Sequence, residues 1–208
     1  RGGGCGAAEF PEGRFEWGQL YDSSDPGAPW KTYVKSGAFI AGVEMFDAAF
    51  FGISPAEASL MDPQQRLLLE VTHEAFEASG LLPAAAAAAA TEQQGAGGVG
   101  VYAGCCTSDY SRLADGVSSS YGVTGVSPSA VAGRVSYTFG LAGPSITIDT
   151  ACSSSLVAAH MAEESLAKGD TRACVVAGTQ ANLSPWAFVV LCQMRALSPD
   201  GLCKTFDA

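Results

Sequence analysis

The sequence has little positive charge. Among 208 residues, 11 are lysine or arginine and 21 are aspartate or glutamate, so the formal net charge at pH 7 is −10. Nucleic acids and anionic membranes are bound through basic protein surfaces. We therefore expect neither nucleic acid nor a membrane as a general partner. The acidic balance also provides no attraction over the whole surface for an acidic carrier protein.

Long apolar runs and paired metal-binding cysteines are also missing. No run of about 18 apolar residues occurs, and the opening RGGGCGAAEF has no apolar segment typical of a signal peptide. The seven cysteines include no C-x-x-C pair and fit neither a disulfide framework nor a zinc site. We therefore expect no bound metal and reduced thiols in the cytoplasm. The abrupt start indicates a missing N-terminus, so organelle targeting stays open.

Three common catalytic motifs are absent as well. The sequence contains no G-x-x-x-x-G-K-[ST] phosphate loop, no G-x-S-x-G elbow and no H-E-x-x-H metal motif. Only two histidines, His73 and His160, are available for acid–base chemistry. These absences disfavour nucleotide hydrolysis, serine hydrolysis of the α/β type and zinc-dependent proteolysis.

The residues that are present predict an α/β protein. The composition is 48% hydrophobic and includes 25 glycines, enough for one sizeable core. Residues 84–98 are a low-complexity alanine- and glycine-rich insert, and residues 1–45 are predicted to be irregular and held by aromatic rings. Strands are predicted at 99–104, 145–148 and 173–177, and helices from 55, at 63–79, from 128 to 139 and from 153 to 168. In the 63–79 helix, Leu68, Val71, Ala75 and Ala78 are expected to face the core.

Cys152 lies where a strand gives way to a helix, in the stretch ITIDTACSSSLVAAH. The first turn of a helix has unpaired N–H groups and a partial positive charge, which favour a thiolate and can steady an oxyanion. The small residues at 151 and 153–155 leave room for an acyl group. On position alone, an equal alternative is that Cys152 is a buried apolar side chain and the serines cap the helix.

The other polar residues offer no obvious partner for this cysteine. His160 follows it by eight residues on the same helix, about 12 Å along the axis, and His73 is expected to be a packed or surface imidazole. A papain-like cysteine–histidine pair is therefore not expected. Asp149 is expected to hydrogen-bond its own turn, and Arg134 and Arg195 are either buried ion-pair partners or exposed charges.

The stretch DTACSSSL, preceded by GPS, resembles the active-site signature of β-ketoacyl synthases, specifically the ketosynthase domains of modular type I polyketide synthases. Three longer blocks agree and occur in the order of that family. They are FDAAFFGISPAEASLMDPQQRLLLE at 46–70, AGRVSYTFGLAGPSITIDTACSSSLVAAH at 132–160 and ALSPDGLCKTFDA at 196–208. The resemblance covers nearly the whole chain apart from the insert. Two departures are Gly133, where the family commonly has asparagine, and His73, where tryptophan is usual.

The resemblance implies a thiolase-like layered fold (α-β-α-β-α), of which residues 1–208 form mainly the N-terminal half. It implies that Cys152 accepts an acyl chain, and that decarboxylative Claisen condensation with a malonyl-type extender follows. No bound cofactor is implied, because the substrates are carried on the phosphopantetheine of an acyl carrier protein. Family members are homodimers, so we expect a homodimer when the domain is complete.

The resemblance also indicates that the domain is truncated at both ends. The chain stops at KTFDA, before the two histidine motifs, the later lysine and the glycine-rich loop of the family. No residue of this chain inherits those roles, so the chain is expected to be an incomplete acyltransferase. Two alternatives stay open: a fatty-acid chain-elongation condensing enzyme, and a catalytically incomplete fragment that only associates with a synthase.

Overall fold

A computed structural model describes residues 6–14, 16–81, 97–113 and 119–204. The chain forms two compact units, one of residues 1–42 with 181–208 and the other of residues 43–180. Of the insert expected at 84–98, only residues 97 and 98 fall in the described part.

A three-stranded parallel sheet forms the centre of the 43–180 unit. Its strands are β3 (Val99–Gly104), β4 (Ser145–Ile148) and β5 (Ala173–Gly178), in the order β4-β3-β5. The strand–helix–strand order around Cys152 in the sequence predicts that residues 145–148 and 173–177 form a parallel pair. This prediction is wrong, because β3 lies between β4 and β5 and hydrogen-bonds to both. The strands themselves match the predicted ranges closely.

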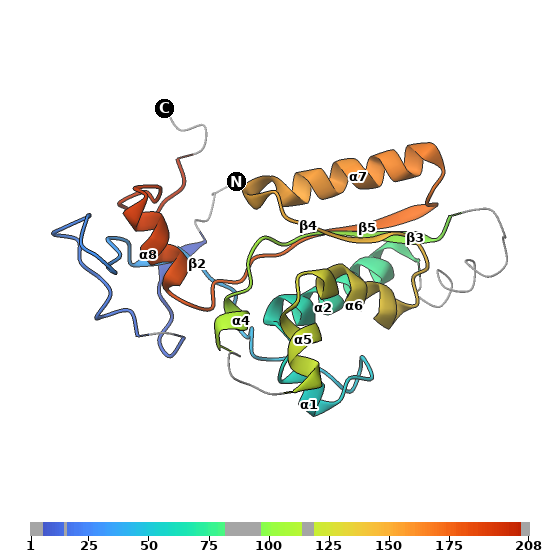
Figure 1. Ribbon diagram of the computed structural model, residues 1–208, viewed down its shortest axis with the longest axis horizontal. Coiled ribbons are helices and arrows are strands. Elements are labelled where there is room, and N and C mark those ends of the chain that lie inside the picture. The colour runs from blue at the N-terminus through green and yellow to red at the C-terminus, as the bar shows by residue number, and fades with distance from the viewer. Residues whose placement is uncertain (1–5, 15, 82–96, 114–118, 205–208) are drawn as a thin grey trace. The chain divides into compact units, whose positions relative to one another are not determined.

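Helices cover both faces of this sheet (Figure 1), so the unit has the expected α/β layering. One face is covered by α2 (Pro63–Ser79) and α6 (Ser129–Phe139), and α7 (Ser154–Lys168) lies on the opposite face. The shorter helices are α1 (Pro55–Ala58), α4 (Asp109–Leu113) and α5 (Ser120–Val126).

The helix ends follow local sequence signals. The Asp62 side chain accepts a hydrogen bond from the N–H of Gln64, and Pro63 occupies the first helical position of α2, where its missing N–H is harmless. Gly80 and Gly169 end α2 and α7 in the left-handed conformation, at φ of 71° and 76°. These boundaries were therefore predictable to within about a residue.

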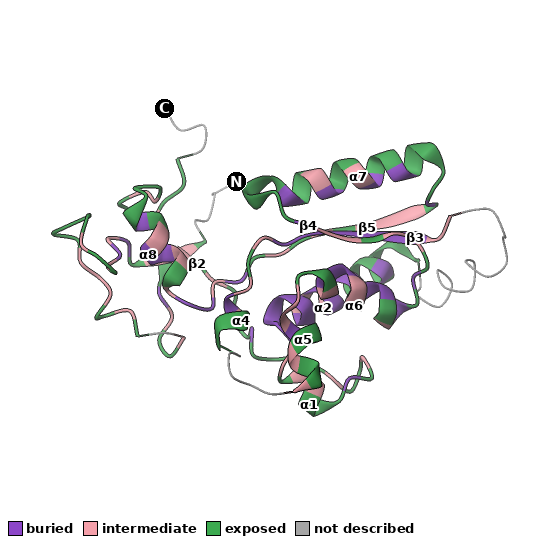
Figure 2. Ribbon diagram, viewed as in Figure 1, coloured by how far each residue is buried: buried purple, intermediate pink, exposed green. Residues whose placement is uncertain are grey.

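The core lies mainly between the sheet and the α2–α6 layer (Figure 2). The predicted buried stripe of α2 is partly wrong, since Val71, Ala75 and Ala78 are exposed. The helix instead buries a face that includes Leu68, Leu69, Thr72 and Phe76. Its first turn is also buried although it is polar, because Gln64 and Gln65 donate hydrogen bonds to backbone carbonyls of other segments.

The other unit is held by aromatic rings, as the sequence indicated. The ring of Phe10 makes edge contacts with those of Trp17, Phe39 and Phe188. Its secondary structure is an antiparallel pair, β1 (Ala7–Glu9) with β2 (Ser36–Ala38), and the helix α8 (Trp186–Gln193). The two strands correct the prediction that residues 1–45 are wholly irregular.

Candidate active site

Cys152 lies in the short turn that joins β4 to α7. Residues Ala151–Ser153 form one turn of 3₁₀ helix directly ahead of Ser154, the first residue of α7. The Cys152 residue is exposed. The alternative that it is a buried apolar side chain is therefore wrong, and the thiol is accessible from outside the 43–180 unit.

The residue before the cysteine has an unusual backbone conformation. Ala151 has a φ of 55°, in the left-handed region that a residue with a Cβ seldom adopts. The Oδ1 atom of Asp149 accepts a hydrogen bond of 3.0 Å from the N–H of Ala151. The expected role of Asp149, to bond its own turn, is confirmed.

Serine hydroxyls bind the same turn from the helix side. Ser154 Oγ donates to the carbonyl of Ala151 at 2.6 Å and accepts from the N–H of Thr150 at 2.9 Å. Ser153 Oγ donates to the carbonyl of Thr150 at 2.8 Å. Ser153 provides no side-chain cap for α7, so the expected capping role is wrong for this residue. These hydroxyls instead fix the connection that carries Cys152.

Two strand-end glycines let the first turn of α7 approach the sheet. A Cβ on Gly104, the last residue of β3, would lie 2.7 Å from the backbone nitrogen of Ser155 and 2.8 Å from the carbonyl carbon of Ser154. A Cβ on Gly178, the last residue of β5, would lie 2.8 Å from Ser155 Cβ. Sequence reasoning missed both glycines, although Gly104 ends the strand predicted at 99–104 and Gly178 directly follows the strand predicted at 173–177.

The position of the cysteine has a chemical consequence. The first N–H groups of α7 have no partners earlier in the helix, and the helix dipole adds partial positive charge at this end. An accessible sulfur at this end can act as a nucleophile, and the same N–H groups can stabilise negative charge on an attacked carbonyl oxygen.

The two histidines are engaged on their own helices. His160 Nε2 lies 3.8 Å from a carboxylate oxygen of Glu164, and His73 Nε2 lies 3.5 Å from one of Glu77. The His73 ring also makes an edge contact with Phe50, at a centroid distance of 4.8 Å. Of the two expectations for His73, a packed or a surface imidazole, the structure shows a partly buried ring packed against Phe50.

A cavity of about 320 Å³ lies beside the ends of β3 and β4. Its lining includes Asp62, Cys105, Thr147 and Asp149. Burial, and to a smaller extent the nearby Asp62 carboxylate, raise the pKa of the Cys105 thiol to about 11. Cys105 is therefore a protonated thiol at neutral pH.

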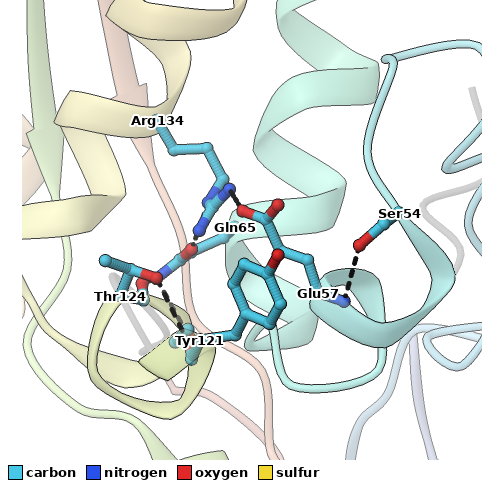
Figure 3. A network of polar contacts seen from close by, with 7 residues as sticks. Ser54, Glu57, Gln65, Tyr121, Thr124 and Arg134 are labelled. Carbon is cyan, nitrogen blue, oxygen red and sulfur yellow. Dashed lines mark hydrogen bonds and ion pairs between the residues drawn. The ribbon is translucent and has the colours of Figure 1, made fainter. Parts of the chain in front are cut away.

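The two arginines left open by the sequence have different surroundings. Arg134 is a partly buried ion-pair partner: its NH1 lies 2.6 Å from Glu57 Oε1 and its Nε donates to Gln65 Oε1 at 2.8 Å (Figure 3). This network ties α1, α2 and α6 together. Arg195 is exposed.

Neither a cluster of metal ligands nor a membrane-spanning helix occurs among the described residues. In the ranges 6–14, 16–81, 97–113 and 119–204, no three His, Cys, Asp or Glu side chains gather as metal ligands. None of the helices described there is long and apolar enough to cross a bilayer.

Comparison with known proteins decides the family. The sequence profile described as "Beta-ketoacyl synthase, N-terminal domain" matches residues 1–208. The chain belongs to the β-ketoacyl synthase family. Its relatives include the spectinabilin polyketide synthase system protein NorC of Streptomyces orinoci, which is 46% identical over 97% of this chain. Erythronolide synthase EryA2 of Saccharopolyspora erythraea is 44% identical over 100% of this chain.

Solved ketosynthase structures have the same fold as this β-ketoacyl synthase chain. The oxazolomycin ketosynthase domain OzmH KS7 of Streptomyces albus matches 96% of the chain with a TM-score of 0.83 and 34% identity. The ketosynthase from module 6 of the Bacillus subtilis bacillaene synthase matches 95% with a TM-score of 0.75 and 34% identity. The thiolase-like α/β fold expected from the resemblance is confirmed.

The chain spans only part of these relatives. It covers 9% of NorC and 6% of EryA2, and 34% and 30% of the two ketosynthase structures. The matched part includes the turn that carries Cys152.

Proposed function

We propose that this chain is part of a ketosynthase domain of a modular type I polyketide synthase, and that Cys152 is the residue that accepts the growing acyl chain. The observation that carries the proposal is an accessible cysteine at the N-terminal end of α7, in a chain that matches the ketosynthase profile along its whole length. The relatives reported above are polyketide synthases, which favours this class over fatty-acid elongation enzymes.

The first step is transfer of an acyl group. The Cys152 thiolate attacks the carbonyl carbon of an acyl thioester, and the negative charge moves to the carbonyl oxygen. The N–H groups at the start of α7 are the donors available to stabilise that oxyanion. The carbon–sulfur bond to the carrier then breaks, and the carrier thiolate takes up a proton.

The second step forms the new carbon–carbon bond. A malonyl-type extender loses carbon dioxide, and the electron pair left on its α-carbon attacks the acyl carbon on Cys152. A β-ketoacyl thioester forms on the carrier, and the Cys152 thiolate is released. We assign no residue of this chain to the decarboxylation, since neither His73 nor His160 matches the histidine motifs to which the family resemblance gives that role.

The partners follow from this chemistry. The substrates are thioesters on the phosphopantetheine of an acyl carrier protein, and the reaction requires no metal or other bound cofactor. A homodimer of the complete domain and a cytoplasmic location remain predictions from the family resemblance. An association role without catalysis is the alternative, and it predicts no acyl transfer to this chain.

Intact-protein mass spectrometry tests the acyl-transfer step. The protein is incubated with an acyl thioester of N-acetylcysteamine beside Cys152→Ala, with Cys105→Ala as the matched control. We expect one added acyl mass in the wild type and in Cys105→Ala, and none in Cys152→Ala. Acylation that persists in folded Cys152→Ala contradicts the assignment, and absence of acylation in all three folded proteins supports the association role. For residues 1–208 alone, we expect little condensation product.

A further inference from the structure

We infer that Asp149 and Ser154 are positioning residues that hold Ala151 in its left-handed conformation and so direct the sulfur of Cys152. The inference rests on the proposed function, in which that sulfur attacks an acyl thioester. Neither side chain needs to touch the substrate. Asp149 holds the N–H of Ala151, and Ser154 holds its carbonyl.

Ala151 requires such support because its conformation is unfavourable. Left-handed backbone places the Cβ of an L-residue close to a carbonyl oxygen, and only glycine avoids this cost. In the described part of the chain, the other non-glycine residues with positive φ are Trp30 and Arg195, which both lie in the other unit. Among the described non-glycine residues of the 43–180 unit, Ala151 is thus the one with left-handed backbone, and it directly precedes the nucleophile.

Both polar groups of Ala151 are bonded by side chains. Its N–H donates to Asp149 Oδ1 at 3.0 Å, and its carbonyl accepts from Ser154 Oγ at 2.6 Å. The Ser154 hydroxyl also accepts from the N–H of Thr150 at 2.9 Å, so one oxygen links both sides of the residue. If Ala151 relaxed to negative φ, the peptide groups on either side would rotate and these bonds would be lost.

Ser154 is well placed to act as a fixed support. Ser154 is 5% exposed, and its backbone packs directly over Gly104 at the end of β3. The hydroxyl therefore has little freedom to move away from Ala151. Asp149 is continuous with β4, so the two supports join the turn to the sheet and to α7.

Ser153 provides a matched comparison on the same turn. It is exposed, and its hydroxyl bonds to the carbonyl and hydroxyl oxygens of Thr150 but makes no bond to Ala151. Removal of either serine hydroxyl deletes one oxygen atom from the turn. Only Ser154 touches the strained residue, so the inference predicts different effects for the two changes.

The test measures the rate at which Cys152 is alkylated by iodoacetamide at pH 8, followed by peptide mass spectrometry. We expect Ser154→Ala and Asp149→Ala each to slow alkylation about tenfold, because a left-handed alanine is disfavoured by roughly that factor without support. Ser153→Ala should change the rate less than twofold. Asp149→Asn keeps an oxygen that accepts the Ala151 N–H, and it should retain most of the wild-type rate.

Glycine at position 151 supplies the decisive control. Glycine adopts positive φ without strain, so Ala151→Gly should restore most of the rate in the Ser154→Ala and Asp149→Ala backgrounds. A role in general stability alone predicts no such rescue. If Ser154→Ala does not fold, as judged by circular dichroism, the same comparison is made between Asp149→Ala alone and Asp149→Ala combined with Ala151→Gly.

The outcomes separate this inference from the proposed function. Equal effects of the two serine changes, or no rescue by Ala151→Gly, overturn the positioning role even if the wild type is acylated. The expected alkylation pattern together with no acyl transfer from the thioester supports the positioning role and contradicts the proposed function.

Discussion

Cysteines follow two neighbouring parallel strands of the same sheet, yet their surroundings are opposite. We call residues 105–108 the β3 connection and residues 149–153 the β4 connection. Cys105 opens the β3 connection and is 6% exposed, whereas Cys152 lies in the β4 connection and is exposed. The comparison shows that the turn after the strand, and not the strand end itself, determines whether a thiol can react.

The β3 connection buries its cysteine at once. The N–H of Cys105 donates to the carbonyl of Ile148 at 3.0 Å, so the hydrogen bonding between the strands continues one residue past β3. Asp62, at the start of α2, accepts a hydrogen bond from Ser108 Oγ and places a negative charge near the thiol. Burial and this charge both disfavour the thiolate.

The β4 connection turns its cysteine outward instead. Three residues separate Ile148 from Cys152, and the last of them, Ala151, has a left-handed backbone. The start of α7 then adds the partial positive charge of the helix dipole, which favours an anion. The same residue type is therefore kept inert in one connection and accessible in the other.

The largest expected effect is on thiol reactivity. At pH 8, iodoacetamide should label Cys152 at least a hundredfold faster than Cys105, because a pKa of about 11 leaves only about one Cys105 in a thousand as thiolate. Peptide mass spectrometry distinguishes the two sites. Labelling of Cys105 should rise about tenfold per pH unit up to pH 10. Equal labelling at pH 8 in the folded protein contradicts the contrast.

The second prediction concerns the close packing of the strand ends of β3 and β5 against the first turn of α7. Gly104→Ala should lower the free energy of unfolding by about 3 kcal/mol and slow Cys152 alkylation, because the new Cβ collides with the backbone of α7. Gly178→Ala should have a smaller effect, since its short contact is with Ser155 Cβ. Urea denaturation measures both changes.

A second-site change sharpens that prediction. Ser155→Gly removes the atom that Gly178→Ala meets, so it should recover much of the loss in that background. It should not rescue Gly104→Ala, whose collision is with backbone atoms. Rescue of both variants to the same extent contradicts the geometry at the two strand ends.

The third prediction is a pH dependence of stability. The folded pKa of Cys105, about 11, lies above the ordinary value near 9, so the unfolded chain loses this proton first as the pH rises. The free energy of unfolding should therefore fall by up to roughly 2 kcal/mol between pH 9 and pH 11. Urea denaturation of Cys105→Ala, compared with the wild type, should show a shallower decline. An unchanged slope contradicts the raised pKa.

A fourth, smaller effect is expected from the charge of Asp62. Asp62→Asn keeps an oxygen able to cap α2 but removes the negative charge that raises the Cys105 pKa. Labelling of Cys105 at pH 9 should increase a few-fold, with burial still holding the pKa above its ordinary value. Labelling of Cys152 measured in the same digest serves as the internal control, and a slower Cys105 reaction contradicts the assigned cause.

The smallest effect has the opposite sign. Gly133 lies in the interior of α6, and a Cβ added there meets nothing within 4 Å. Gly133→Ala should raise the free energy of unfolding by about 1 kcal/mol, because alanine is the better helix former. Thermal unfolding followed by circular dichroism tests this, with Gly104→Ala as the same substitution where no space is available. A loss of stability contradicts the open surroundings of Gly133.

The sequence by itself determined the elements of the 43–180 unit and the identity of the candidate nucleophile. Proline, aspartate and glycine mark the ends of α2, α6 and α7, and β-branched runs mark β4 and β5, because these signals act through local backbone geometry. The position of Cys152 between a strand and a helix was likewise legible from residues close together in the chain. Its accessibility was not, since an accessible and a buried thiol fit that position equally well.

Only the tertiary structure decided which groups meet across the chain. The order β4-β3-β5, the buried polar first turn of α2 and the pairing of Arg134 with Glu57 depend on partners far away in sequence. The support of Ala151 by Asp149 and Ser154 depends on one backbone torsion that no residue pattern specifies. Periodicity reports which side chains are apolar, but burial and hydrogen bonding are decided by the neighbours that the fold supplies.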